Sequence, residues 1–205
     1  MLRRLWMGVA ALLLFLGLLA GSVLAVGLNA PLMARQFARY GQAAGIAQDA
    51  QREAIATEVV DYLAHRRSDL PTFQAHEQAH MADVRGIFDS LWALAIAGLA
   101  SGVLLWRFRR RGSLKTCWKV FLGLGVLLVG LVAWAMIDFD SLFILFHQVA
   151  FTNDLWLLDP RTDLMIQLMP TPFFIDYAAR IAGLFAGLAA GTGCLSAGLN
   201  RRYVR

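Results

Sequence analysis

Histidine is the residue type best suited to chemistry in this sequence, and the histidines all lie outside the long apolar stretches of the chain. The four are His65, His76, His80 and His147. An imidazole has an ordinary pKa of about 6.5, so it exchanges protons near neutral pH and also binds metals. The histidines are therefore the first candidates for a catalytic or metal site.

One group of these residues spells the H-E-x-x-H pattern of zinc proteases, at His76, Glu77 and His80. Histidines four residues apart share a helix face and can hold Zn²⁺, with the glutamate as general base. A third protein ligand is needed. Glu77 is the last glutamate of the chain, so a distant aspartate such as Asp159 would have to supply it. Chance occurrence on a polar helix face is the preferred interpretation of this pattern, and an intramembrane zinc metalloprotease is the alternative.

Two further histidine environments have functional interpretations. His80 and Asp83 are neighbours on a helix surface, where a carboxylate favours the imidazolium and can fix the tautomer. His147 stands in the apolar run 141–151. An ionisable group in such surroundings is costly, which makes it a candidate functional residue. The alternatives are an ordinary exposed pair for His80 and Asp83, and for His147 a ring that reaches water or a carbonyl oxygen.

The elements that must position these residues are transmembrane helices. Hydrophobic residues make up 59% of the chain and charged residues 16%, against about half and about a quarter in soluble proteins. A bilayer core needs about 20 apolar helical residues. We expect an all-α, four-helix membrane bundle in a single domain, with spans at about residues 5–28, 88–107, 118–138 and 175–199. A cleaved signal peptide is the alternative for the first span, which is long for one.

Charge distribution predicts the orientation of these spans. The basic clusters lie before the first span, between the second and third, and after the fourth, and none of them contains an acidic residue. Positively charged segments stay in the cytosol. We therefore expect both termini inside, and loops of about 29–87 and 139–174 on the extracytoplasmic face. The net charge of +5 is a topology signal, and no nucleic-acid partner is expected.

Both outer loops have helical patterns. Residues 47–67 carry apolar side chains at helical spacing, Leu70-Pro71 interrupts, and from Thr72 a helix runs into the second span and protrudes outward. The run 141–151 is too apolar for water and too short to span, which favours a re-entrant or interfacial helix. Residues 163–168 indicate a short helix, and Thr171-Pro172 has the chemistry of a helix start.

Several motifs in these loops resemble the lipoprotein intramolecular transacylase (Lit) family of bacterial membrane proteins. They are Tyr62-Leu63, Glu77-x-x-His80-Met81-x-Asp83-Val84, Phe146-His147-x-x-x-Phe151-x-Asn153-x-x-Trp156-x-Leu158-x-Pro160-x-x-Asp163, and Pro170-x-x-Phe173-Phe174-x-Asp176. The resemblance covers the four-helix layout and both outer loops. In this comparison the family's two functional histidines match His80 and His147, whereas His76 is not part of the pattern.

The resemblance implies an acyltransferase of the plasma membrane. The enzyme would move an acyl chain from the diacylglyceryl group of a lipoprotein to the α-amine of its N-terminal cysteine, giving the lyso form. Histidine suits an amine nucleophile of pKa near 8. The tetrahedral oxyanion requires donors, for which Asn153, Trp156 and Arg85 are candidates, with Asp83 and Asp159 as orienting or substrate-contacting residues.

The partners implied are diacylglyceryl-modified lipoproteins and membrane lipid, without a cofactor or metal. The zinc metalloprotease and a non-enzymatic membrane scaffold are the alternative functions.

Overall fold

The computed structural model describes residues 2–43, 45–46, 48–107 and 111–202, and within them the chain is helical throughout its regular structure. The helices are α1 Leu2–Gly27, α2 Ala30–Tyr40, α3 Asp49–Leu63, α4 Ala75–Arg107, α5 Arg111–Ile137, α6 Phe139–Ala150, α7 Leu164–Leu168 and α8 Thr171–Arg202. Arg109, Arg110 and Arg205, which belong to the predicted cytosolic clusters, lie outside the described residues.

Four helices of the described chain are long and apolar enough to cross a membrane. They are Leu5–Gly27, Ala75–Arg107, Cys117–Ile137 and Thr171–Thr192. The prediction of an all-α membrane protein with four spans is confirmed. The single-domain organisation stays a prediction, because the chain divides into two compact units.

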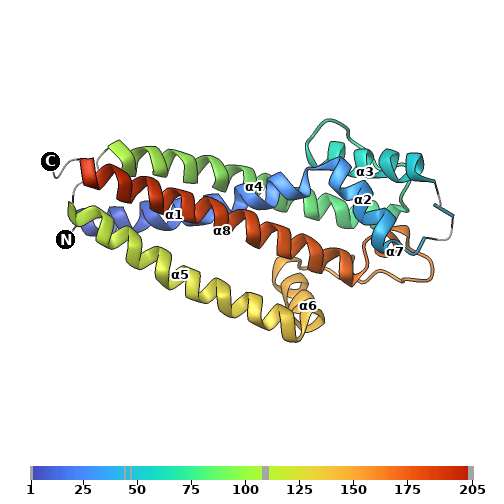
Figure 1. Ribbon diagram of the computed structural model, residues 1–205. Coiled ribbons are helices and arrows are strands. Elements are labelled where there is room, and N and C mark those ends of the chain that lie inside the picture. Colours follow the sequence, from blue (N-terminus) through green and yellow to red (C-terminus); the bar gives the residue numbers. More distant parts are fainter. Residues whose placement is uncertain (1, 44, 47, 108–110, 203–205) are drawn as a thin grey trace. The chain divides into compact units, whose positions relative to one another are not determined.

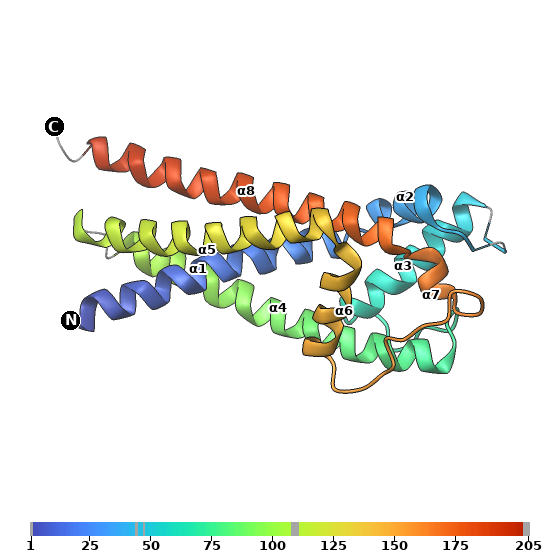
Figure 2. The same ribbon diagram turned by 90° about the horizontal axis from the view of Figure 1, so that it is seen from below.

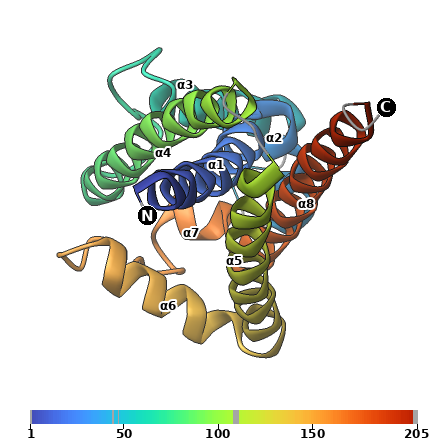
Figure 3. The same ribbon diagram turned by 90° about the vertical axis from the view of Figure 1, so that its left-hand side faces the viewer.

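The first unit, here called the span unit, comprises Met1–Val23, Leu91–Ala133 and Arg180–Arg205. In it α1 lies against α4 (Figure 3), and the two backbones meet at Gly17 and Gly98. A Cβ on Gly17 would stand 2.5 Å from the Cα of Gly98, so only glycine permits this approach. The ring of Phe15 packs edge-on against Phe121 and Phe185, with centroids 5.4 and 4.8 Å away.

The second unit, here called the loop unit, comprises Leu24–Ser90 and Trp134–Ala179 and contains all four histidines. Helix α2, which the sequence did not delimit, follows α1 almost directly, and the Asn29 side chain caps it by accepting from the N–H of Leu32 at 2.9 Å. Its apolar face is buried, and it packs against α3 (Figure 1). Phe37 of α2 stacks on Phe173 at 5.9 Å.

Helix α4 begins in the loop unit and continues without a break, as the pattern from Thr72 predicted. Its first turns carry several charged or titratable side chains, including His80 and Asp83, whereas residues 90–106 carry none. Seventeen helical residues rise about 25 Å, close to the thickness of a bilayer core. We therefore expect residues 90–106 to form the membrane-crossing part of α4, and its first turns to lie outside the bilayer core.

The segment between the third and fourth spans also has its predicted helices. Helix α6 begins after Asp138, whose side chain accepts from the N–H of Ser141 at 3.0 Å. An irregular segment then leads to α7, and α8 starts at Thr171 (Figure 2). The membrane depth of α6 remains a prediction.

Candidate active site

Helix α6 exposes apolar side chains and buries a histidine, the reverse of an ordinary amphipathic helix. Phe146 and Val149 are 51% and 79% exposed, whereas His147 is the one buried residue of the helix. Burial of a polar imidazole costs free energy that burial of phenylalanine or valine would not. An imidazole kept in such a position is therefore expected to have a function. This inversion makes His147 a candidate functional residue.

The hydrogen bonding of His147 fixes its tautomer. Its Nδ1 lies 2.7 Å from the carbonyl oxygen of Phe143, one helical turn earlier. A carbonyl oxygen only accepts, so Nδ1 carries the proton and Nε2 of the neutral ring presents a lone pair. Burial lowers the pKa of His147, and the hydrogen bond to Phe143 opposes this effect. A neutral His147 ring can therefore accept a proton only at Nε2.

His80 of α4 faces His147, with 6.1 Å between the ring centroids. It is 6% exposed, and its buried Nδ1 has no hydrogen-bond partner. Burial, and to a smaller extent the neighbouring His147, lower the pKa of His80 from 6.5 to about 4, against an opposite effect of the Asp83 carboxylate. Buried polar atoms are nearly always bonded, so this nitrogen is a candidate hydrogen-bonding position of the site.

Four aromatic rings, here called the aromatic enclosure, surround His147, and one of them also contacts His80. Around His147 the ring centroids of Phe143, Phe146, Phe151 and Trp156 lie at 4.1, 5.3, 5.5 and 5.1 Å. Phe151 also meets His80 edge-on at 5.1 Å. Two of these rings were part of the sequence resemblance without an assigned role. The spacing of Phe143 and Phe151, four residues to either side of His147, is the signal that places them beside its ring.

Asp83 and Asn153 are joined beside the pair. The Asn153 amide donates to the Asp83 carboxylate at 2.8 Å, and its oxygen accepts from the N–H of Leu155 at 3.1 Å. Asp83 thus acts on His80 through its charge and holds the loop after α6 through this hydrogen bond. Asn153 retains one amide N–H for another acceptor.

Arg85 contacts residues other than His80 and His147. Its guanidinium stacks 4.7 Å over the ring of Tyr62 and donates to His65. The Nε2 of His65 also contacts the Asp89 carboxylate at 2.6 Å. His65 has φ of 58° at the end of α3, where glycine is usual. Arg85 is therefore committed to tying α3 to α4, which weakens its case as an oxyanion donor.

Asp159 likewise has other partners. Its carboxylate accepts three hydrogen bonds from the Arg161 side chain, the shortest 2.7 Å. The hydrogen bonds from Arg161 lower the pKa of Asp159 to about 2. The Asp159 carboxylate thus bonds within its own loop, so a direct role at the histidines is not supported.

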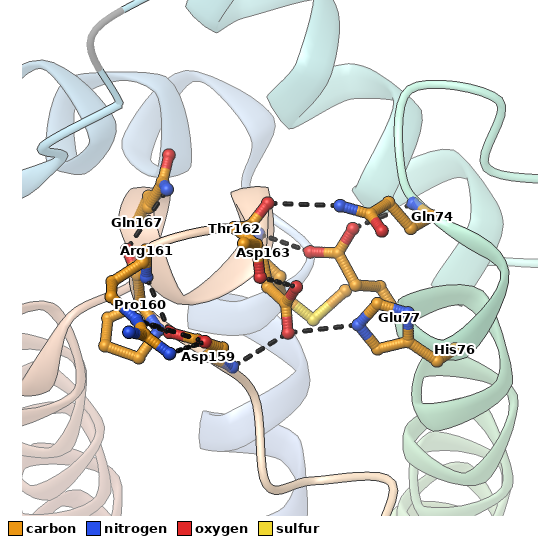
Figure 4. A network of polar contacts seen from close by, with 10 residues as sticks. Gln74, His76, Glu77, Asp159, Pro160, Arg161, Thr162, Asp163 and Gln167 are labelled. Atoms are coloured by element: carbon orange, nitrogen blue, oxygen red, sulfur yellow. Dashed lines mark hydrogen bonds and ion pairs between the residues drawn. The ribbon is translucent and has the colours of Figure 1, made fainter.

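The H-E-x-x-H residues have structural partners. Glu77 is fully buried, and its two oxygens accept from the main-chain N–H groups of Gln74 and Met165 at 2.8 and 2.7 Å. His76 pairs with Asp163 at 3.0 Å. Figure 4 shows that these side chains point toward the segment before α7. Within the described residues no three histidine, cysteine or acidic side chains are grouped to hold a metal ion.

A model of the lipoprotein intramolecular transacylase Lit family matches residues 9–174, most of the chain. This chain belongs to the Lit family. The resemblance expected from the loop motifs is thereby confirmed, as is the activity class, an acyltransferase that acts on lipoproteins. Nothing in the family match or the fold favours the protease or the scaffold.

Solved structures of Lit from Bacillus cereus share the fold. One superposes with a TM-score of 0.79 at 18% identity, over 98% of this chain and 97% of that chain. Two others, in which a histidine is replaced by arginine or by alanine, give TM-scores of 0.66 at 18% identity, over 98% of this chain and 93% and 95% of theirs. At this identity the likeness shows the fold alone. None of the curated proteins matches the chain in sequence.

Proposed function

We propose that this protein is a lipoprotein intramolecular transacylase in which His80 and His147 carry the proton transfers. The cysteine α-amine attacks an acyl ester of the diacylglyceryl group on the same cysteine. A C–N bond forms, the C–O bond to glycerol breaks, and a glyceryl hydroxyl is left. The observation that carries this proposal is the pair of buried imidazoles 6.1 Å apart inside an aromatic enclosure.

The proton balance of this reaction explains why two neutral imidazoles suit it. The α-amine has an ordinary pKa near 8 and is mostly protonated at neutral pH. Its nitrogen must lose two protons to become an amide, whereas the leaving glyceryl oxygen gains one. Two bases are needed, and one of them returns its proton as an acid. Burial lowers the pKa of both histidines, so both begin neutral at pH 7.

The surroundings of the two rings favour different roles. His147 is held by its Nδ1–H on the Phe143 carbonyl, so its Nε2 removes the second amine proton as the tetrahedral intermediate forms. His80 takes the first proton and returns it to the glyceryl oxygen. The Asp83 carboxylate supports the cation of His80 in the interval, and the unpartnered Nδ1 provides a hydrogen-bonding position.

The oxyanion of the intermediate needs donors in the same enclosure. Trp156 is the stronger candidate, because its ring lies 5.1 Å from that of His147 and an indole carries one N–H donor. The second amide N–H of Asn153 is the other. No enzyme nucleophile is required, because amine and ester sit on one substrate and positioning replaces it.

We place this site at the extracytoplasmic face of the bacterial plasma membrane, with both termini in the cytosol. The basic clusters at alternate connections support this orientation. Both acyl chains of the substrate lie in the bilayer, so a site just outside the membrane-crossing part of α4 suits the ester. The exposed apolar face of α6 suits contact with lipid.

The test is the acylation state of a reporter lipoprotein made with and without this protein. Intramolecular transfer leaves the mass unchanged, so an amine-reactive reagent is needed to distinguish the isomers. We expect the reporter N-terminus to become resistant to the reagent, and tandem mass spectrometry to place one acyl chain on nitrogen. A reporter that keeps its free amine in cells that contain the protein would contradict the proposal.

A further inference from the structure

The loop between α6 and α7, residues 151–163, supplies half of the aromatic enclosure. Phe151 and Trp156 come from this loop, and they lie 5.5 and 5.1 Å from the ring of His147. Residues 152–154 between them are exposed. An irregular loop of this kind holds its rings against the histidines only if its ends are fixed.

The first turns of α4 fix both ends of this loop. Near its start, Asn153 is bonded to Asp83 at 2.8 Å. At its far end, the buried Asp163 accepts from His76 at 3.0 Å, from the N–H of Asp159 at 2.8 Å and from the Thr162 hydroxyl at 2.8 Å. His80 lies between these two attachments on the same helix.

Glu77 strengthens the far attachment. Its Oε1 accepts from the N–H of Met165 at the start of α7, and its Oε2 from the N–H of Gln74. The Gln74 amide in turn donates to the carbonyl of Thr162 at 3.1 Å. Figure 4 shows these contacts converging on the turn before α7. His76, Glu77 and Asp163, here called the latch, thus join α4 to the end of the loop.

The latch holds buried carboxylates, which are costly unless they are fully bonded. Burial by itself raises the pKa of Asp163, but hydrogen bonds from His76, the Asp159 N–H and Thr162 outweigh it and lower the pKa. Asp163 is therefore ionised at neutral pH and keeps its donors. Charge-assisted hydrogen bonds of this kind are roughly twice as strong as neutral ones.

We propose that the latch decides whether the acyl chain passes to the amine or to water. A histidine base beside an ester can activate water, which would release a free fatty acid and leave a glyceryl hydroxyl. With the loop latched, Phe151 and Trp156 keep water from the histidines, so that the amine of the bound substrate is the nucleophile at hand. His76, Glu77 and Asp163 are positioning residues, and the inference rests on the proposed transacylase function.

The experiment measures how the products partition in purified protein reconstituted with a diacylglyceryl lipopeptide. N-acyl product has the substrate mass and a blocked amine, whereas hydrolysis product has lost one acyl chain and keeps a free amine. In His76→Ala we expect the ratio of hydrolysis to transfer to rise roughly tenfold, since one hydrogen bond to a charged group is lost. His76→Gln, which keeps an N–H donor, should restore much of the wild-type ratio.

Arg161→Ala is the matched control. Arg161 lies on the same loop beside Asp163 but bonds Asp159 and not α4, and its side chain is 86% exposed. Its product ratio should equal that of the wild type. Asp163→Asn should exceed His76→Ala in hydrolysis. If the Asp163→Asn variant fails to fold because Asp163 is buried, the His76→Ala variant still tests the proposal, since His76 is half-exposed.

Two results would separate the claims. If the wild type forms no N-acyl product, the proposed function itself fails. If the wild type transfers normally and His76→Ala transfers with the same product ratio, or loses both products in proportion to its thermal stability, the latch does not control partition and the inference is overturned.

Discussion

The Asn153 amide donates a hydrogen bond to the Asp83 carboxylate at 2.8 Å, across 70 residues of sequence. This contact ties the loop that carries Trp156 to the helix that carries His80. The negative charge of Asp83 raises the pKa of His80, and so opposes the lowering caused by burial and by His147. Two residues that the sequence placed in separate roles therefore act together.

The first prediction concerns this pair. Asp83→Ala and Asn153→Ala should each reduce conversion of a reporter lipoprotein by about tenfold, less than loss of either histidine, since a hydrogen bond to a charged group is removed. The double variant should be little worse than either single one. A double-mutant cycle on initial rates measures this coupling. Effects that simply multiply would show that the two side chains act independently.

The second prediction concerns pH. Burial lowers the pKa of His147, and burial with His147 lowers that of His80 to about 4, so both bases stay neutral as the pH falls below 6.5. The midpoint of the acid limb of kcat should therefore lie below the ordinary histidine pKa of about 6.5. The profile is measured with lipopeptide substrate in proteoliposomes. An acid limb centred at 6.5 or above would mean that the bases titrate like exposed histidines.

The third prediction concerns metal. Both oxygens of Glu77 accept main-chain N–H groups, and His76 is paired with Asp163. Chelators should therefore leave activity unchanged. Glu77→Gln should lower the free energy of unfolding by roughly 1–3 kcal/mol, because a buried N–H loses its acceptor. Thermal denaturation and activity assays with and without zinc measure both effects. Loss of activity with a chelator and its recovery with zinc would contradict this prediction and favour the metalloprotease hypothesis.

The fourth prediction concerns orientation. The basic segments before the first span, between the second and third, and after the fourth should lie in the cytosol. After Arg205, a reporter that works only in the cytosol should be active, and one that works only outside the membrane should be inactive. Within residues 39–50 the two reporters should give the opposite result. The opposite pattern would put the histidines on the wrong face for mature lipoproteins.

Much of the fold could be predicted from local patterns. The four spans, the continuous α4 and the helix near 141–151 follow from apolar length, helical spacing and the absence of breakers. Helix α2 was not delimited, because its start signals, the cap Asn29 and the proline that follows at N1/N2, come directly after a span. Apolar length gives the existence of a span more reliably than its ends.

The site was only partly predictable for a different reason. The depth of His147 in an apolar run and the loop motifs pointed to the histidine pair. The partners of three charged residues depend on the folded structure, and local spacing in the sequence does not encode them. Arg85 stacks on Tyr62, Asp159 binds Arg161, and Glu77 accepts from an N–H of a helix 88 residues away. A charged residue near a motif can therefore have a structural role, and its contacts in the folded protein show whether that role is structural or catalytic.

The histidine pair is the centre of the proposed mechanism. The ring centroids of His80, on α4, and His147, on α6, lie 6.1 Å apart. If one returns a proton that the amine gave up and the other removes the second, loss of either stops the reaction. General acid or base work is typically worth 10²–10⁴-fold, and residues that act as a unit are not additive.

The most direct test is the initial rate of N-acylation by His80→Ala, His147→Ala and the double variant, each at wild-type protein levels. We expect both single variants to lose at least about 100-fold, and the double variant to be little slower than either. His65→Asn is the control, since that histidine lies in the separate Arg85 and Asp89 cluster, and it should retain near-normal rates. Wild-type conversion by both single histidine variants would contradict the proposed mechanism.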